Sequence, residues 1–360
     1  MDSQNGVNDE ACSHPQSIHL IGGPGGSRAI LAVSGMLLAL KYLGIDNYVT
    51  IGGISGGSLP LRLLASGMSV KQIVETAIDL RFLDLLDADA KISAVMADHY
   101  RSGRYKGQRP AKGLYRSEKL GDWVNSFSLD GDWPQRFWTM AVEGESQILF
   151  TSEGLYERTK GQPFKVICAQ SQDLGKAVRA SCSVPGWFTP VEVVLDKEGR
   201  KLLLYDGGLS WEGRTPLSIP EDHFKAHPKN VIMCDVGIEP GAKEFIFSAI
   251  WKLVCGGKCI TPLGERPAKD DQNLVIRPVV TSVSSFDFDA HPDRKWEAIM
   301  EGFAATVLDL NKAYRLDAEK FLQAREIIEE YYSSVFSLKK EPSGALSDKT
   351  VKLLTKHGVL

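Results

Sequence analysis

The sequence lacks the marks of a membrane-spanning or secreted protein. No apolar run reaches the ~20 residues that a membrane-spanning helix needs. The first fifteen residues are polar and include acids, without the basic start and apolar stretch of a secretory signal. We therefore expect a cytoplasmic protein that meets lipid only peripherally, at a membrane surface.

Positive charge is not in excess either. The 42 Lys and Arg are balanced by 45 Asp and Glu, which gives a formal net charge of −3. Because this balance provides no general attraction to nucleic acid, we expect no nucleic-acid partner. With 43% hydrophobic and 24% charged residues, the 360-residue chain is typical of a globular protein with a substantial core.

Metal-binding patterns are also missing. Several of the six cysteines lie inside apolar runs, as Cys168 does, which is typical of reduced, buried thiols in a reducing compartment. Cys255 and Cys259 lie close together, but no second pair or nearby histidine completes a metal site. We expect neither a metal nor an organic cofactor.

What is present at the start of the chain predicts an α/β fold. A short strand, Ser17–Ile21, leads into the glycine-rich loop 22–28, and the apolar run 29–43 is typical of a buried helix. A second strand, Tyr48–Ile51, runs through a glycine turn into another helix, Ser58–Ala65. This alternation predicts a central, largely parallel sheet flanked by helices, with right-handed crossovers.

The rest of the pattern completes a single domain. We expect a loose tail at 1–15, the domain at 16–340 with a helical and basic insertion near 70–127, and a C-terminal tail at 341–360. Further strands are predicted at Phe137–Val142 paired with Gln147–Thr151, at Phe164–Ala169 as a buried strand, and at Val191–Leu195, Lys201–Tyr205, 231–236 and 274–280. Further helices are predicted at Leu174–Ser183, Trp296–Tyr314 and Ala318–Phe336.

A candidate nucleophile lies between the second strand and its helix. The pentapeptide Gly53-Ile54-Ser55-Gly56-Gly57 has the G-x-S-x-G pattern of a nucleophile elbow. A serine on such a turn adopts strained backbone angles, and Gly53, Gly56 and Gly57 would avoid clashes around it. The positive end of the following helix would point at the reacting centre. Ser55 is therefore predicted to attack the substrate.

The glycine-rich loop holds candidate oxyanion donors. Attack on a carbonyl creates a negative oxygen, and each well-placed N–H donor stabilises it by ~3–4 kcal/mol. The loop can turn several N–H groups toward one point, and the candidates are Gly23, Gly25, Gly26, Ser27 and Arg28. A phosphate-binding loop is the alternative, but no Gly-Lys-Ser/Thr follows, and Arg28 occupies the third glycine position of the dinucleotide pattern.

Asp206 is the candidate base. It ends an apolar strand and precedes two glycines, so its carboxylate can approach the elbow from a neighbouring strand end. Asp-Gly pairs are also common in ordinary turns, and Asp235 is a second strand-end acid that competes for the role. An α/β-hydrolase triad would add a later histidine, namely His223, His227 or His291, but each lies in a polar stretch that favours a surface position.

Together these three segments resemble the patatin-like phospholipase family, which combines a glycine-rich oxyanion loop, a G-x-S-x-G elbow and a later Asp-Gly-Gly or Asp-Gly-Ala. Residues 180–188 and 284–287 resemble further segments of that family. The resemblance implies a three-layer α/β/α fold and a dyad of Ser55 and Asp206 without a histidine.

The resemblance also implies oxyanion donors around Gly25, Gly26 and Ser27. The family's loop usually has a glycine where this sequence has Pro24. Because proline has no N–H to donate, Gly25 and Gly26 would carry that role here.

The function implied is a lipid acyl hydrolase of the phospholipase A or lysophospholipase type. It would cleave a phospholipid or another lipid ester at a membrane surface through an acyl-enzyme. An acyltransferase with the same dyad and a non-catalytic lipid-binding module are the alternatives. Trp187 and Phe188, next to the family segment, are candidates to line an acyl pocket. The basic, tyrosine-containing stretch Tyr100–Arg116 is either a contact for anionic headgroups or a solvated loop.

Overall fold

The computed structural model describes residues 17–91, 93–95, 97–98, 111–127, 133–134, 136–195, 199–237, 273–338 and 344–360. Several features expected from the sequence lie outside the described residues. These are the N-terminal tail, most of the basic stretch (Tyr100–Pro110), and Cys12, Cys255 and Cys259. The described Cys168, Cys182 and Cys234 are buried free thiols.

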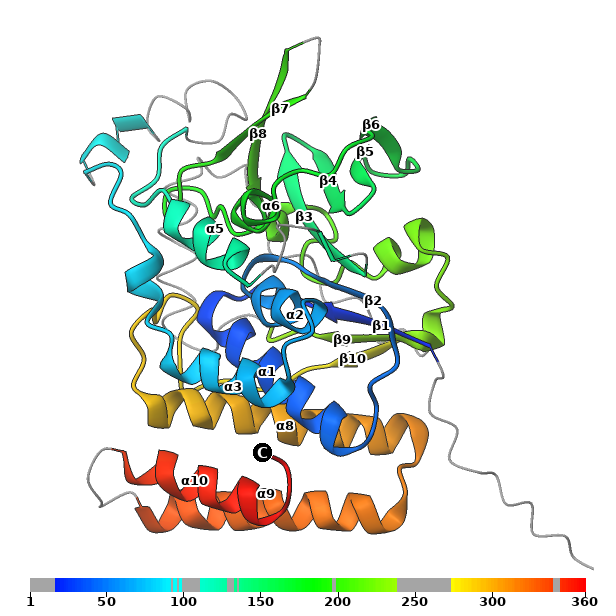
Figure 1. The fold of residues 1–360 in the computed structure, drawn as a ribbon, viewed down its shortest axis with the longest axis vertical. Helices are drawn as coiled ribbons and strands as arrows, with labels where there is room; N and C mark the ends of the chain where they lie inside the picture. The colour runs from blue at the N-terminus through cyan, green and yellow to red at the C-terminus, as the bar shows by residue number, and fades with distance from the viewer. Residues whose placement is uncertain are drawn as a thin grey trace, which may run out of the picture.

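A mixed sheet of ten strands forms the centre of the protein, in the order β10-β9-β1-β2-β3-β4-β5-β6, with β8 paired to β3 and β7 paired to β8 (Figure 1). The strands are β1 (Ile18–Gly22), β2 (Tyr48–Gly53), β3 (Phe137–Glu143), β4 (Ser146–Thr151), β5 (Gly154–Arg158), β6 (Lys165–Cys168), β7 (Val191–Leu195), β8 (Arg200–Asp206), β9 (Val231–Cys234) and β10 (Leu274–Ile276). Pairing is parallel from β10 to β3 and antiparallel through the remaining strands. The predicted α/β class is confirmed, with a parallel half and an antiparallel half.

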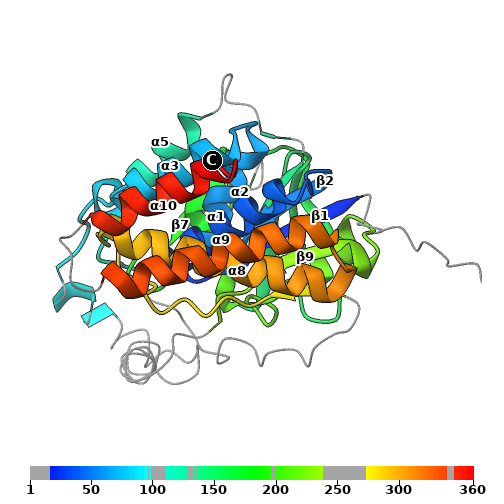
Figure 2. The ribbon, with the colours of Figure 1, turned by 90° about the horizontal axis from the view of Figure 1, so that it is seen from below.

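The helices of the described chain are α1 (Gly26–Tyr42), α2 (Ser58–Ala65), α3 (Val70–Asp79), α5 (Glu118–Asn125), α6 (Leu174–Ser181), α8 (Pro292–Tyr314), α9 (Ala318–Leu338) and α10 (Ala345–Lys356). α1 is buried along most of its length and packs on α8, with α9 and α10 forming an outer pair (Figures 1 and 2). The contact of α1 with α8 is close because glycines face it. A Cβ on Gly35 would lie 1.9 Å from the carbonyl oxygen of Ile299.

Two hydrophobic cores lie on the two faces of the sheet. Alternate residues of β1 point to opposite faces, so Leu20 belongs to the larger core with the helices and Ile21 to the smaller one. In the described part of the chain, the smaller core is covered by Leu217, Ile219 and the helical turn Ile219–His223.

Three local expectations are corrected by the structure. β6, expected to be buried, is an edge strand on which Val166 is 60% exposed. The segment 341–360, expected to be a tail, contains α10, whose Leu353 and Leu354 are buried in the larger core. His223, expected on the surface, is half-buried. In each case partner elements far away in sequence decide the burial.

Candidate active site

Ser55 occupies a strained turn between β2 and α2. Its φ of +53° is rare for a residue with a side chain. The surrounding glycines are required by close backbone approaches. A Cβ on Gly53 would lie 2.7 Å from Ser58 Cα, and one on Gly57 would lie 2.3 Å from the Gly23 carbonyl oxygen. The pentapeptide therefore has the local geometry of a nucleophile elbow.

Strand pairing brings Ser55 and Asp206 together. β2 lies parallel to the first half of β3, with Gly53 opposite Thr139, and β8 lies antiparallel to its second half, with Asp206 opposite Ala141. Because β4 occupies the other edge of β3, β2 and β8 share one edge and their carboxyl ends converge. Thr139 and Ala141, which pair with Gly53 and Asp206, are two residues apart on β3, and two residues span about 7 Å along a strand. Asp206 therefore approaches the elbow end-on and does not come from a neighbouring parallel strand.

The Asp206 carboxylate is buried and only partly hydrogen-bonded. Its Oδ1 accepts the N–H of Gly208 at 2.7 Å, while Oδ2 has no hydrogen-bond partner among the described residues. Burial raises the pKa of Asp206 to about 7, although the Ser55 hydroxyl and the Gly208 N–H oppose the shift. The hydroxyl thus lies near enough to affect the carboxylate without completing a hydrogen bond to Oδ2. A pKa near 7 suits a general base at neutral pH.

The glycine loop packs directly on the elbow. A Cβ on Gly56 would lie 2.2 Å from the Gly26 carbonyl oxygen. The N–H groups of Gly23 and Ser27 already donate to the carbonyl oxygens of Cys234 (2.9 Å) and Ser285 (3.0 Å). In this conformation neither N–H is available to a substrate, because an N–H has one hydrogen to donate.

The N–H groups of Gly25 and Gly26 are available. Within the described chain neither donates to an acceptor. The φ of +56° at Gly26 is a left-handed conformation that favours glycine. The Arg28 side chain is turned away toward β9, where it donates to the carbonyl oxygen of Val236 at 2.8 Å. Gly25 and Gly26 are therefore retained as candidate oxyanion donors.

The last residue of α6 and the residues after it contact both candidate catalytic residues. The Ser55 N–H donates to Ser181 Oγ at 3.0 Å, and the Asp206 N–H donates to the Ser183 carbonyl oxygen at 2.9 Å. Between them, burial and the Asp206 carboxylate raise the pKa of the Cys182 thiol, which therefore stays protonated. These residues lie in the segment 180–188 that the sequence analysis singled out, but the sequence did not predict their contacts with Ser55 and Asp206.

Asp235, the competing acid, is held in an ion pair. Its Oδ1 lies 3.1 Å from Arg214 Nε and its Oδ2 lies 3.5 Å from Arg277 Nε. It also accepts the N–H of Gly237 at 2.9 Å. Two guanidinium groups and an N–H thus engage both carboxylate oxygens of Asp235, whereas Asp206 keeps one oxygen without a hydrogen-bond partner among the described residues.

The candidate histidines are engaged elsewhere. His223 packs edge-on against Tyr156, with ring centroids 4.4 Å apart, and burial lowers its pKa. His291 Nδ1 accepts the N–H of Asp293 at the start of α8, and His227 caps a turn in the same way. Neither Ser55 nor Asp206 has a histidine partner in the described chain. Among the described residues, the arrangement contains no serine–histidine pair at Ser55.

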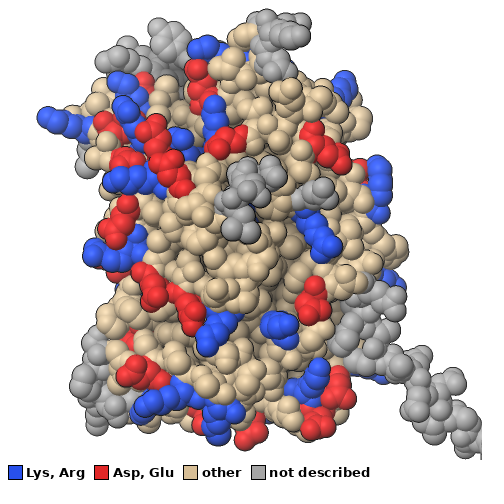
Figure 3. Space-filling model, in the orientation of Figure 1, with Lys and Arg blue, Asp and Glu red and all other residues tan. Residues whose placement is uncertain are grey.

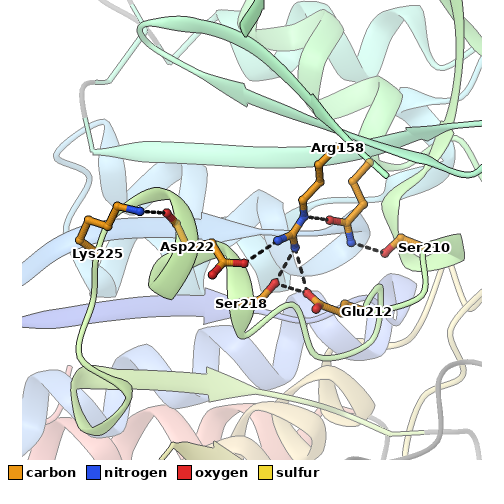
Figure 4. Close-up of polar contacts among 7 residues, drawn as sticks. Arg158, Ser210, Glu212, Ser218, Asp222 and Lys225 are labelled. Carbon is orange, nitrogen blue, oxygen red and sulfur yellow. Dashed lines mark hydrogen bonds and ion pairs between the residues drawn. The ribbon is translucent and has the colours of Figure 1, made fainter. Parts of the chain in front are cut away.

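A buried arginine holds the loop that follows Asp206 (Figure 4). Arg158, on β5, is 5% exposed and contacts Gln147 Oε1 at 2.6 Å and Glu212 Oε2 at 3.1 Å. Gln147 Nε2 in turn donates to Ser210 Oγ at 3.1 Å. The loop 207–214 is thereby tied to the antiparallel half of the sheet, which restrains the backbone next to Asp206.

Trp187 and Phe188, the candidates for an acyl pocket, differ in environment. Phe188 is buried and lies against Tyr115, with ring centroids 6.4 Å apart. Trp187 is half-buried and stacks on Phe286, with ring centroids 4.7 Å apart and an interplanar angle of 14°. The stacked partner comes from the 284–287 segment, so the structure joins two segments that the sequence presents a hundred residues apart.

The surface offers no large field of one sign on the face shown in Figure 3, where Lys and Arg alternate with Asp and Glu. Among the described residues, no group of three or more His, Cys, Asp or Glu side chains is placed to hold a metal. The helices within the same residues are too short or too polar to cross a membrane.

Comparison with known proteins identifies the family. The profile of the patatin-like phospholipase family matches residues 23–213, which include the glycine loop, the elbow and the Asp206 turn. Among curated proteins, none matches the sequence.

Similar folds occur among solved structures. VipD from Legionella pneumophila is 15% identical with a TM-score of 0.44, the match covering 96% of this chain and 80% of VipD. The type III effector ExoU is 12% identical with a TM-score of 0.38, over 96% of this chain and 69% of ExoU. ExoU in its complex with SpcU from Pseudomonas aeruginosa is 15% identical with a TM-score of 0.35, over 96% of this chain and 67% of that chain.

Proposed function

The chain belongs to the patatin-like phospholipase family, and from this premise we propose that it hydrolyses fatty-acyl esters of phospholipids through an acyl-enzyme on Ser55. The observation that carries the proposal is the convergence of the β2 and β8 ends. It brings the strained serine to a buried carboxylate whose Oδ2 lacks a hydrogen-bond partner among the described residues. The N–H groups of Gly25 and Gly26, which have no acceptor among the described residues, support a role as the oxyanion donors.

In the first half-reaction, Ser55 Oγ attacks the ester carbonyl carbon while Asp206 takes the hydroxyl proton. The carbonyl π electrons move to oxygen, and the N–H groups of Gly25 and Gly26 stabilise that negative charge. The tetrahedral intermediate collapses, the C–O bond to the alcohol breaks, and the proton on Asp206 passes to the leaving alkoxide.

The second half-reaction repeats these steps with water. Asp206 removes a proton from water, the hydroxide attacks the acyl-enzyme carbonyl, and the fatty acid leaves as the proton returns to Ser55 Oγ. The general base must be ionised at neutral pH to accept a proton, and it must then release that proton. A pKa of about 7 for Asp206 suits both requirements. The substrate would be met at a membrane surface by a cytoplasmic protein.

The test is hydrolysis of a phospholipid and lysophospholipid panel, followed by mass spectrometry. Wild type is expected to release fatty acids, whereas Ser55→Ala and Asp206→Asn should not. Ser126→Ala and Asp84→Asn, at exposed positions of the described chain, serve as matched controls that should retain activity. Activity that survives in Ser55→Ala would refute the proposal.

The same assay separates the alternative functions. Added alcohols or lysolipids that accept the acyl group in preference to water would identify an acyltransferase. A fluorophosphonate probe distinguishes an enzyme from a lipid-binding module, because it labels an activated serine. Labelling of wild type that is unchanged in Ser55→Ala would favour the binding module.

A further inference from the structure

We propose that Trp187, Phe286 and Phe288 form the site for the fatty-acyl chain and set the preference for long chains. This inference rests on the proposed hydrolase function and adds the residues that recognise the apolar half of the substrate. The proposed site consists of Trp187, Phe286 and Phe288. Phe188, the second acyl-pocket candidate from the sequence, packs against Phe288, with ring centroids 6.4 Å apart.

Phe286 directly follows a residue that touches the oxyanion loop. The Ser285 carbonyl oxygen accepts the Ser27 N–H at 3.0 Å, and a Cβ on Gly26 would lie only 1.9 Å from it. Consecutive Cα atoms are 3.8 Å apart. The ring of Phe286 therefore lies within about 10 Å of the Gly26 N–H that is available to an ester carbonyl.

Trp187 comes from the segment that contacts the two reacting residues. Ser181 accepts the Ser55 N–H, and the Ser183 carbonyl accepts the Asp206 N–H. The Trp187 N–H continues this turn by donating to the Val184 carbonyl oxygen at 3.1 Å. The stacked pair of Trp187 and Phe286 thus joins one segment fixed to the oxyanion loop and another fixed to the serine and the aspartate.

Phe288 completes the aromatic group, and polar contacts hold the segment that carries it. Phe288 stands edge-on to both rings, with centroids 6.3 Å from Trp187 and 5.8 Å from Phe286. Between the two phenylalanines, Asp287 turns toward α8 and pairs with Arg294 at 3.0 Å. Arg294 also donates to the Ser282 carbonyl oxygen at 2.6 Å. These polar contacts orient the phenylalanines toward Trp187 before any substrate arrives.

The pair is not explained by core packing. Trp187 and Phe286 belong to neither hydrophobic core, and both are only half-buried. A stacked apolar surface that stays partly open beside a reacting centre is suited to cover methylene groups. An acetyl group on the serine would be too short to reach it, whereas a fatty-acyl chain would extend across it.

The proposal predicts a chain-length preference that depends on these rings. Each methylene taken from water raises kcat/KM about fourfold. We expect Trp187→Ala and Phe286→Ala to lower the ratio of kcat/KM for p-nitrophenyl decanoate over p-nitrophenyl acetate by roughly 15- to 60-fold, which corresponds to two or three methylenes. The acetate rate should stay close to wild type. Phe336→Ala, at a 71% exposed position on α9, is the matched control.

The outcomes distinguish this inference from the proposed function. A wild type that cleaves neither ester refutes the hydrolase itself. A wild type that cleaves both, with an unchanged ratio in the Trp187 and Phe286 variants, overturns the acyl site alone. Where an alanine variant does not fold, Trp187→Leu and Phe286→Leu keep a smaller apolar side chain but lose the flat ring. They are expected to lower the ratio less than alanine does, and an unchanged ratio in these variants overturns the proposal equally.

Discussion

The replacement Asp206→Asn separates the chemistry of the buried carboxylate from its structural role. An amide has nearly the same shape, and its oxygen can still accept the Gly208 N–H that Oδ1 accepts at 2.7 Å. It cannot take a proton from Ser55. We expect hydrolysis to fall by about 10²- to 10⁴-fold, the usual contribution of a general base.

The same replacement is expected to stabilise the fold at neutral and alkaline pH. Burial raises the pKa of Asp206 from 3.8 to about 7, so the folded protein holds a proton that the unfolded chain has already released. The contribution of Asp206 to stability is therefore greatest below pH 3.8 and is lost as the pH rises through about 7. Three pKa units correspond to about 4 kcal/mol, and asparagine avoids this cost. For a chain of this length the gain in Tm would be about 5 °C.

Two measurements check this reasoning. Differential scanning calorimetry of wild type and Asp206→Asn should give nearly equal Tm values at pH 4 and a gap of several degrees at pH 8. The kcat/KM of wild type should rise about tenfold per pH unit below 7 and then level off, because only the ionised base is active. Equal Tm gaps at both pH values, or full activity of Asp206→Asn, would refute the assignment.

Three further replacements probe the surroundings. Gly26→Ala should abolish hydrolysis and lower Tm, because its Cβ would lie 1.9 Å from the Ser285 carbonyl oxygen, and retained activity would remove Gly26 from the oxyanion site. Arg158→Met should cost about 3 kcal/mol in a denaturant titration, since it leaves Glu212 unpaired beside a buried site; an unchanged midpoint would mean that the network does not stabilise the loop. Asp235→Asn should also cost about 3 kcal/mol, but the midpoint of the kcat/KM profile should remain near pH 7, and a displaced midpoint would make Asp235 the base.

Local sequence was sufficient for the elbow and for most elements. The glycines around Ser55 predict a tight turn from local sequence alone, because only glycine tolerates the close backbone approaches that this turn requires. The apolar run of α1 predicts a buried helix for a similar reason, since its composition leaves no polar face. β6 and α10 were misjudged because burial depends on which distant elements cover a strand or helix, and hydropathy does not contain that information.

The choice among candidate residues depended on tertiary contacts. Asp206 and Asp235 look alike in sequence, as acids at the ends of apolar strands, yet Asp235 lies between two arginines. In the same way, Gly23, Ser27 and Gly26 all offer an N–H, and only the folded chain reveals that the first two already donate to Cys234 and Ser285. Hydrogen-bond partners that are distant in sequence decide which groups stay available.

By itself, the sequence determined the class of fold, the strained serine turn and the presence of an acid after a later strand, because each follows from local spacing and residue type. The tertiary structure alone decided that β2 and β8 meet end-on along β3, and that Trp187 stacks on Phe286. Both depend on which strands and loops become neighbours, and pairing between distant segments follows from the packing of the whole chain.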